Sequence, residues 1–161
     1  MTWVTVVDGV EDQLDAGGDA EFFENPVEIF LDGVLVEAFE QVKTDVKLVL
    51  AGASSYCDEY SQQLRSHASE SIRILDWVSG EILDELLTNA MIFVLPSDLE
   101  GLSLALLDAM GAGLCVLTSD VPENVEVVDG AGFTFKRGNS ADLADRLRFL
   151  IATLLCEERL A

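Results

Sequence analysis

Positive charge is scarce in this sequence. Nine lysine and arginine residues face thirty aspartate and glutamate residues, the formal net charge is −21, and residues 1–42 hold no lysine or arginine. A surface this acidic repels phosphate backbones and anionic lipid, which argues against nucleic-acid binding and membrane-surface roles. The charge is typical of a solubilising surface, whether salt-adapted or engineered.

Long hydrophobic runs are also missing. The longest, such as Met91 to Pro96 and Leu114 to Leu117, are far too short to cross a bilayer, and no basic-then-apolar leader opens the chain. We therefore expect no membrane insertion and no secretion by a standard signal peptide.

Cysteines are few: Cys57, Cys115 and Cys156 lie far apart, in no metal-ligand or CxxC spacing. They predict reduced thiols in a cytoplasmic protein and no metal site.

The sequence does contain enough apolar material for one domain. The chain has 161 residues, 50 % of them hydrophobic, and its mean hydropathy is +0.31. This length suits one domain with a full core, and the composition excludes wholesale disorder. We predict a single domain over residues 1–161, in which residues 1–25 form an irregular N-terminal strand and loop. The expected strand is Trp3–Val7, and Val27–Val42 has helical spacing.

From residue 46 onward, short β-branched runs alternate with amphipathic stretches. The runs are nearly continuous in hydrophobicity, which indicates strands buried on both faces, as in a parallel sheet. Expected strands are Val46–Ala51, Ile72–Asp76, Met91–Leu95, Leu114–Thr118 and Phe133–Lys136. Expected helices cover about residues 55–68, 80–89, 102–111, 122–128 and 141–156. The alternation predicts an α/β fold: a doubly wound, Rossmann-like parallel sheet with helices on both faces.

Local signals support these helix limits. Ser79 is placed to cap the helix that begins near Glu81, and Asn139 or Ser140 is placed to cap the last helix. Pro122 fits the first turn of the short helix, where its missing N–H costs nothing.

The segment Leu95–Val128 carries the strongest indication of a binding site. A strand ends at Pro96 and a helix is expected to begin near Gly101, so the loop between them lies at the carboxyl end of a strand, where open α/β sheets bind ligands. The free N–H groups of a helix N-terminus favour an anion, and nearby carboxylates can accept hydrogen bonds from sugar or ribose hydroxyls. The candidates are the backbone of Gly101, Leu102 and Ser103 and the carboxylates of Glu100 and Asp108.

A purely structural interpretation of this segment stays open at this point. Ser97 and Glu100 have the spacing of a capping box, which explains both residues without a ligand. Asp108 is equally suited to a solvated surface. Four apolar side chains of the same helix are expected in the core: Leu104, Leu106, Leu107 and Met110.

Several motifs resemble one protein family. Residues 96–113, PSDLEGLSLALLDAMGAG, resemble the PS-x-x-EG run and LEAMA-x-G helix of the C-terminal domain of family-4 retaining GT-B glycosyltransferases. Val46–Gly52 looks like the family's strand ending in AG, and Ile72–Gly80 (IRILDWVSG) looks like its V-x-F-x-G-x-V-S segment. Glu126–Gly130 resembles its E-V-V-x-x-G closure. Together these motifs cover most of residues 46–161.

The resemblance implies one half of a GT-B fold, which binds a nucleotide-diphosphate sugar as donor substrate and needs no other cofactor. By position, Glu100 would touch the donor sugar as the catalytic-site acid, and Asp108, shorter than the family's glutamate, would hold the ribose hydroxyls. Backbone N–H groups of Gly101, Leu102 and Ser103 would receive the distal phosphate or sugar. Residues around Val78 would line the base pocket.

The sequence departs from the family at the diphosphate site. Family members carry a GR pair and a lysine before a glycine, and these cations neutralise the leaving diphosphate. Here Asp32 stands where the lysine is expected, and Phe23, Glu24 and Asn25 stand where GR is expected. Since charge stabilisation is most of what such a site does, a carboxylate there reverses the interaction.

The resemblance also implies that the acceptor domain is missing. Trp3–Glu11 (WVTVVDGVE) looks like the family's V-x-V-I-P-N-G-V-D stretch at the join of the two GT-B domains. We therefore expect a donor-binding domain that is inactive in isolation. Two alternatives remain: an engineered or degenerate glycosyltransferase-derived scaffold without a ligand, and a donor-domain subunit that works with a separate acceptor-domain chain.

Overall fold

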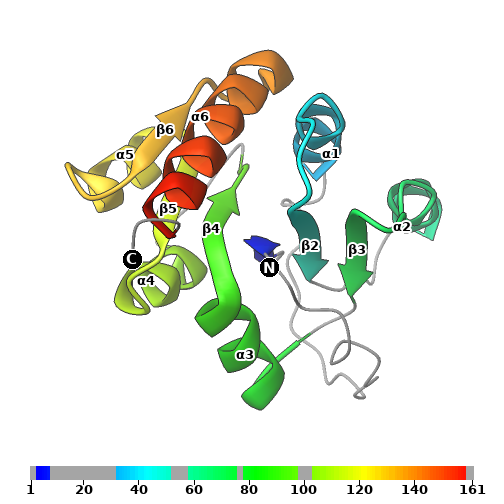
Figure 1. Cartoon of the computed structure of the whole chain (residues 1–161), viewed down its shortest axis with the longest axis horizontal. Coiled ribbons are helices and arrows are strands. Elements are labelled where there is room, and N and C mark those ends of the chain that lie inside the picture. The colour runs from blue at the N-terminus through cyan, green and yellow to red at the C-terminus, as the bar shows by residue number, and fades with distance from the viewer. Residues whose placement is uncertain (1–2, 8–31, 52–57, 76–77, 98–102, 159–161) are drawn as a thin grey trace.

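The computed structural model describes residues 3–7, 32–51, 58–75, 78–97 and 103–158. The elements in chain order are β1 Trp3–Val7, α1 Asp32–Glu40, β2 Lys47–Ala51, α2 Asp58–Arg65, β3 Ile72–Leu75, α3 Glu81–Asn89, β4 Ala90–Leu95, α4 Leu104–Gly111, β5 Cys115–Ser119, α5 Pro122–Val128, β6 Phe133–Phe135 and α6 Ser140–Glu158 (Figure 1). Each expected strand and helix has a counterpart in this order. Among the described helices, none has the length and apolar character needed to cross a membrane.

The strands form one six-stranded sheet in the order β3-β2-β1-β4-β5-β6 (Figure 1). β2 pairs with β3 in parallel, and β5 pairs in parallel with both β4 and β6. Because β2 and β4 are each antiparallel to β1, the five strands expected from residue 46 onward all point the same way. The predicted fold class, a doubly wound α/β sheet with helices on both faces, is confirmed.

The central strand β1 is the one strand in the described sheet that runs against the others. Thr5 lies opposite Val49 of β2 on one side and opposite Phe93 of β4 on the other. The register with β4 shifts between Val6 and Val7. Its position joins two parallel halves, β3-β2 and β4-β5-β6, into one sheet, and so the sheet is mixed at its centre.

Each face of the sheet carries its own apolar core. On β4, Ile92 and Val94 pack toward α1 and α6, whereas Phe93 and Leu95 pack toward α3, α4 and α5. Successive side chains of a strand point to opposite faces, so a strand covered on both sides must be apolar at nearly every position. This burial explains the unbroken hydrophobic runs of the sequence.

The helix ends agree with most of the predicted caps and correct one. Asn139 accepts a hydrogen bond through Oδ1 from the N–H of Asp142, 3.0 Å away, and Pro122 occupies the first turn of α5. The predicted cap Ser79 is wrong: the residue before α3 is Gly80, with φ of 60° and no side-chain cap. Glycine adopts this left-handed backbone without a steric penalty, so the chain enters α3 through its backbone conformation.

Candidate functional site

The candidate site lies at the carboxyl ends of β4 and β5, beside the start of α4. β4 ends at Leu95, and the chain continues through Ser97 toward α4, which begins at Leu104. Glu100, Gly101 and Leu102 lie outside the described residues. The segment from Ser97 to Ser103 is called the connection below. The described part of the site consists of these two end residues and the residues packed around them.

Ser103 forms the α4 end of the connection. It is the N-cap of α4, is only 1 % exposed, and accepts a hydrogen bond through Oγ from the N–H of Leu106, 3.3 Å away. α4 thus begins two to three residues later than the sequence predicted, and Ser103, not Ser97, is its cap. The N–H groups of Leu104 and Ala105 complete the first turn, where the helix dipole favours an anion.

A buried polar cluster holds the β4 end of the connection. Ser119, the last residue of β5, donates from Oγ to the carbonyl oxygen of Ser97, 2.5 Å away, and Asn124 of α5 donates from Nδ2 to Ser119 Oγ, 3.4 Å away. Ser119 and Asn124 are 0 % and 1 % exposed. Sequence reasoning missed both residues; the signal was the pair of hydroxyl residues, Thr118 and Ser119, that ends an otherwise apolar strand.

The other predicted residues lie around this edge. Val78 follows β3, is buried, and belongs to the core shared by α3 and α4. Asp108 lies in the middle of α4 with its carboxylate exposed. The expected core set of this helix is half wrong: Leu106 is fully buried, but Leu104 and Leu107 are 61 % and 39 % exposed. The helix therefore presents two leucines to solvent beside the candidate site.

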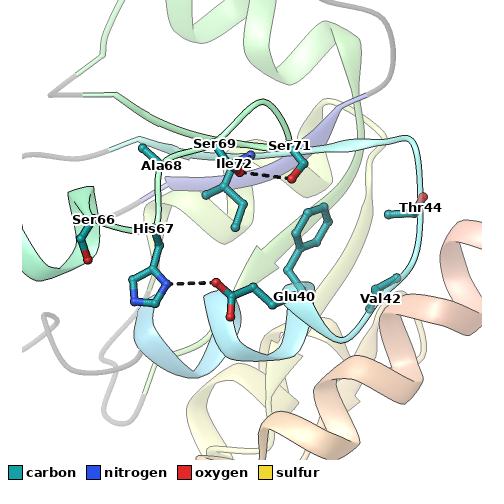
Figure 2. A pocket seen from close by; sticks show the side chains of 10 residues that line it. Glu40, Val42, Thr44, Ser66, His67, Ala68, Ser69, Ser71 and Ile72 are labelled. Atoms are coloured by element: carbon teal, nitrogen blue, oxygen red, sulfur yellow. Dashed lines mark hydrogen bonds and ion pairs between the residues drawn. The ribbon is translucent and has the colours of Figure 1, made fainter.

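A depression lies at the opposite ends of the strands, where β2 and β3 begin (Figure 2). Its volume is about 410 Å³ and hydroxyl side chains line much of it. Glu40 at the end of α1 accepts a hydrogen bond from Nδ1 of His67, 3.0 Å away. Ligands of open α/β sheets bind at the carboxyl ends of the strands, so this depression is separate from the candidate site.

The described residues offer no metal centre. In those parts of the chain, no three histidine, cysteine, aspartate or glutamate side chains gather closely enough to hold an ion. Burial raises the pKa of the thiol of Cys115, the first residue of β5. This thiol is at the amino end of its strand, away from Ser119.

Comparison with known proteins places most of the chain in one family. A family profile described as "Glycosyl transferases group 1" matches residues 32–153. O-antigen chain mannosyltransferase B of Escherichia coli is 34 % identical over 104 residues, which are 61 % of this chain and 27 % of the relative. Alpha-maltose-1-phosphate synthase of Mycobacterium tuberculosis is 31 % identical over 140 residues, which are 78 % of this chain and 36 % of the relative.

Solved structures share the fold at lower identity. A glycosyltransferase from Rickettsia africae superimposes with a TM-score of 0.69 at 20 % identity, covering 75 % of this chain and 34 % of that one. Anabaena HepE, in complex with UDP and glucose, also superimposes with a TM-score of 0.69, at 19 % identity, covering 81 % of this chain and 37 % of that one. In each comparison, the chain spans roughly a third of its relative.

Proposed function

Because this chain belongs to the group 1 glycosyltransferase family, we propose that it binds the nucleotide-sugar donor of a hexosyltransferase. The observation that carries the proposal is the start of α4. Its capped N-terminus lies at the ligand-binding edge of the sheet, directly after the segment that carries the family's PS-x-x-EG motif. The complex of Anabaena HepE with UDP and glucose supports the same donor class.

Each part of the motif has a role in this proposal. Glu100 contacts the donor sugar, Asp108 accepts hydrogen bonds from the ribose hydroxyls, and Val78 lies beside the base. The N–H groups from Gly101 to Ser103 receive the distal phosphate or sugar. Held in this way, the diphosphate leaves with its developing charge facing the positive end of α4.

The shortage of cations sets the expected affinity. Residues 1–42 hold no lysine or arginine, and Asp32, the first residue of α1, stands where the family has a lysine. Each lost charge-assisted contact to a diphosphate costs about 1.5–3 kcal/mol. Two losses weaken binding by about a hundredfold or more, so we expect dissociation constants no better than millimolar for UDP or GDP.

We expect the chain to bind a donor without transferring its sugar. The relatives are about three times as long as the segment that matches this chain. The acceptor would be bound by a separate domain or partner chain. Detection of glycosyl transfer by the purified chain, abolished by Glu100→Ala, would contradict this expectation.

A titration with UDP- and GDP-sugars, followed by the backbone NMR signals of the labelled chain, tests the proposal. Saturating shifts near Ser97, Ser103 and Asp108 are expected, with inorganic pyrophosphate at equal concentration as the control. The lack of lysine and arginine in residues 1–42 favours a second candidate, a glycosyltransferase-derived scaffold without a ligand. That candidate is correct if no nucleotide sugar shifts these signals more than pyrophosphate does.

A further inference from the structure

The hydroxyl of Ser119, at the end of β5, is hydrogen-bonded to the chain just after the end of β4. Its proton is donated to the carbonyl oxygen of Ser97, 22 residues earlier in the chain, at the point where the connection to α4 begins. The hydroxyl has one proton, so its own orientation depends on a donor that binds its lone pair. Asn124 supplies that donor through Nδ2.

Asn124 occupies a site that favours an apolar residue on energetic grounds. It is 1 % exposed, and among the described residues its Oδ1 is the buried side-chain oxygen that has no hydrogen-bond partner. Native proteins rarely leave such an atom unpaired, because its lost hydration is not replaced. A buried polar side chain with an unpaired oxygen destabilises the fold, and such residues are expected where function requires them.

We infer that Ser119 and Asn124 are positioning residues for the donor site, an inference that rests on the proposed function. They fix the Ser97 carbonyl at one end of the connection, while the buried cap Ser103 fixes the other end against α4. Neither side chain needs to touch the donor, since both are buried. Their effect is to hold the backbone on either side of the motif at a constant position.

Thr118 provides a matched control on the same strand. Like Ser119 it is 0 % exposed, and its Oγ1 donates to the carbonyl oxygen of Leu95, 3.2 Å away. That bond joins β5 to the last residue of β4 and stays within the sheet. Thr118→Val and Ser119→Ala each remove one buried hydroxyl, and only the second releases Ser97.

The experiment compares Ser119→Ala, Asn124→Ala and Thr118→Val in the full chain, with urea unfolding measured for each. We expect the first two variants to weaken the affinity for UDP-glucose or GDP-mannose, whichever binds, by about tenfold, the value of one hydrogen bond that positions the site. Thr118→Val should stay within about twofold even where its stability falls as much. Equal weakening by Thr118→Val and Ser119→Ala, or unchanged affinity in Ser119→Ala, would overturn the inference.

Amide hydrogen exchange separates this inference from the proposed function, because it needs no ligand. In Ser119→Ala, exchange at Ser103 and Leu106 should rise by about tenfold over that in Thr118→Val, because the inference requires the bond to Ser97 to steady both ends of the connection. If the unmodified chain binds no nucleotide sugar, the proposed function is wrong, and this exchange comparison decides the positioning role. Equal exchange in the two variants rejects that role.

Discussion

Gly132 lies so close to Val116 that a β-carbon on the glycine would stand 2.5 Å from Val116 Cγ2. Val128 borders the same point, with its Cβ at 3.0 Å. Val116 is a fully buried residue of β5, so it has little room to move. Gly132→Ala should therefore lower the free energy of unfolding by about 1–3 kcal/mol, through overpacking. Urea unfolding of the variant measures this loss.

Gly33, unlike Gly132, has room for a β-carbon. It lies in the first turn of α1, and a β-carbon there would meet nothing within 4 Å. Gly33→Ala should raise the free energy of unfolding by about 0.4–1 kcal/mol, because alanine costs less backbone entropy in a helix. A Gly132→Ala variant as stable as the unmodified chain would contradict the close packing around Gly132, and a loss of stability in Gly33→Ala would contradict the open surroundings of Gly33.

Asp32 is expected to oppose a bound diphosphate, so Asp32→Lys should strengthen the binding of UDP or GDP. The gain should be about tenfold, the lower end of what one charge-assisted contact contributes. Glu37→Lys on the exposed side of α1 changes the net charge by the same amount and is the control. Equal gains in the two variants would show that overall charge, and not the position of residue 32, limits binding.

The thiols of Cys115 and Cys156 should react at different rates with iodoacetamide. Cys156 is exposed, whereas Cys115 is half-buried and burial raises its pKa. Only the thiolate is nucleophilic, so Cys115 should react slower by about tenfold or more at pH 8. Peptide mapping by mass spectrometry gives both rates, and equal rates would contradict the burial of Cys115.

The same pKa shift has a consequence for stability. The unfolded chain releases the Cys115 proton at a lower pH than the folded chain does. The free energy of unfolding should therefore fall as the pH rises above about 8.5, the ordinary value for a thiol. Cys115→Ala should remove this part of the alkaline destabilisation, which urea unfolding at two pH values would reveal.

The hydrogen bond between His67 and Glu40 should contribute little to stability. Both side chains are open to solvent, at 40 % and 51 % exposure. Exposed pairs are worth less than about 1 kcal/mol, and salt screens them. A double-mutant cycle with His67→Ala and Glu40→Ala measures the coupling, which should shrink at high salt. A coupling well above this value would contradict the solvent exposure of the two side chains.

The strands and helices were predictable because their signals are local. β2 and β4 are apolar at nearly every position, and α5 opens on Pro122. The start of α4 was not predicted correctly, since Ser97 and Ser103 both precede a plausible helix. Only packing, which buries Ser103 and lets its hydroxyl reach Leu106, selects between them. The roles of Glu100, Gly101 and Leu102 stay predictions.

The sequence by itself determined the alternation of strands and helices, the class of the sheet and the likeness to glycosyltransferases, because each depends on residues that are close together in the chain. The tertiary structure decided which way β1 runs, since a short apolar strand can pair in either direction and only its partners β2 and β4 select one. It also decided that Ser119 meets Ser97 and that Leu104 faces solvent. Such contacts join residues distant in the chain, and no local pattern specifies them.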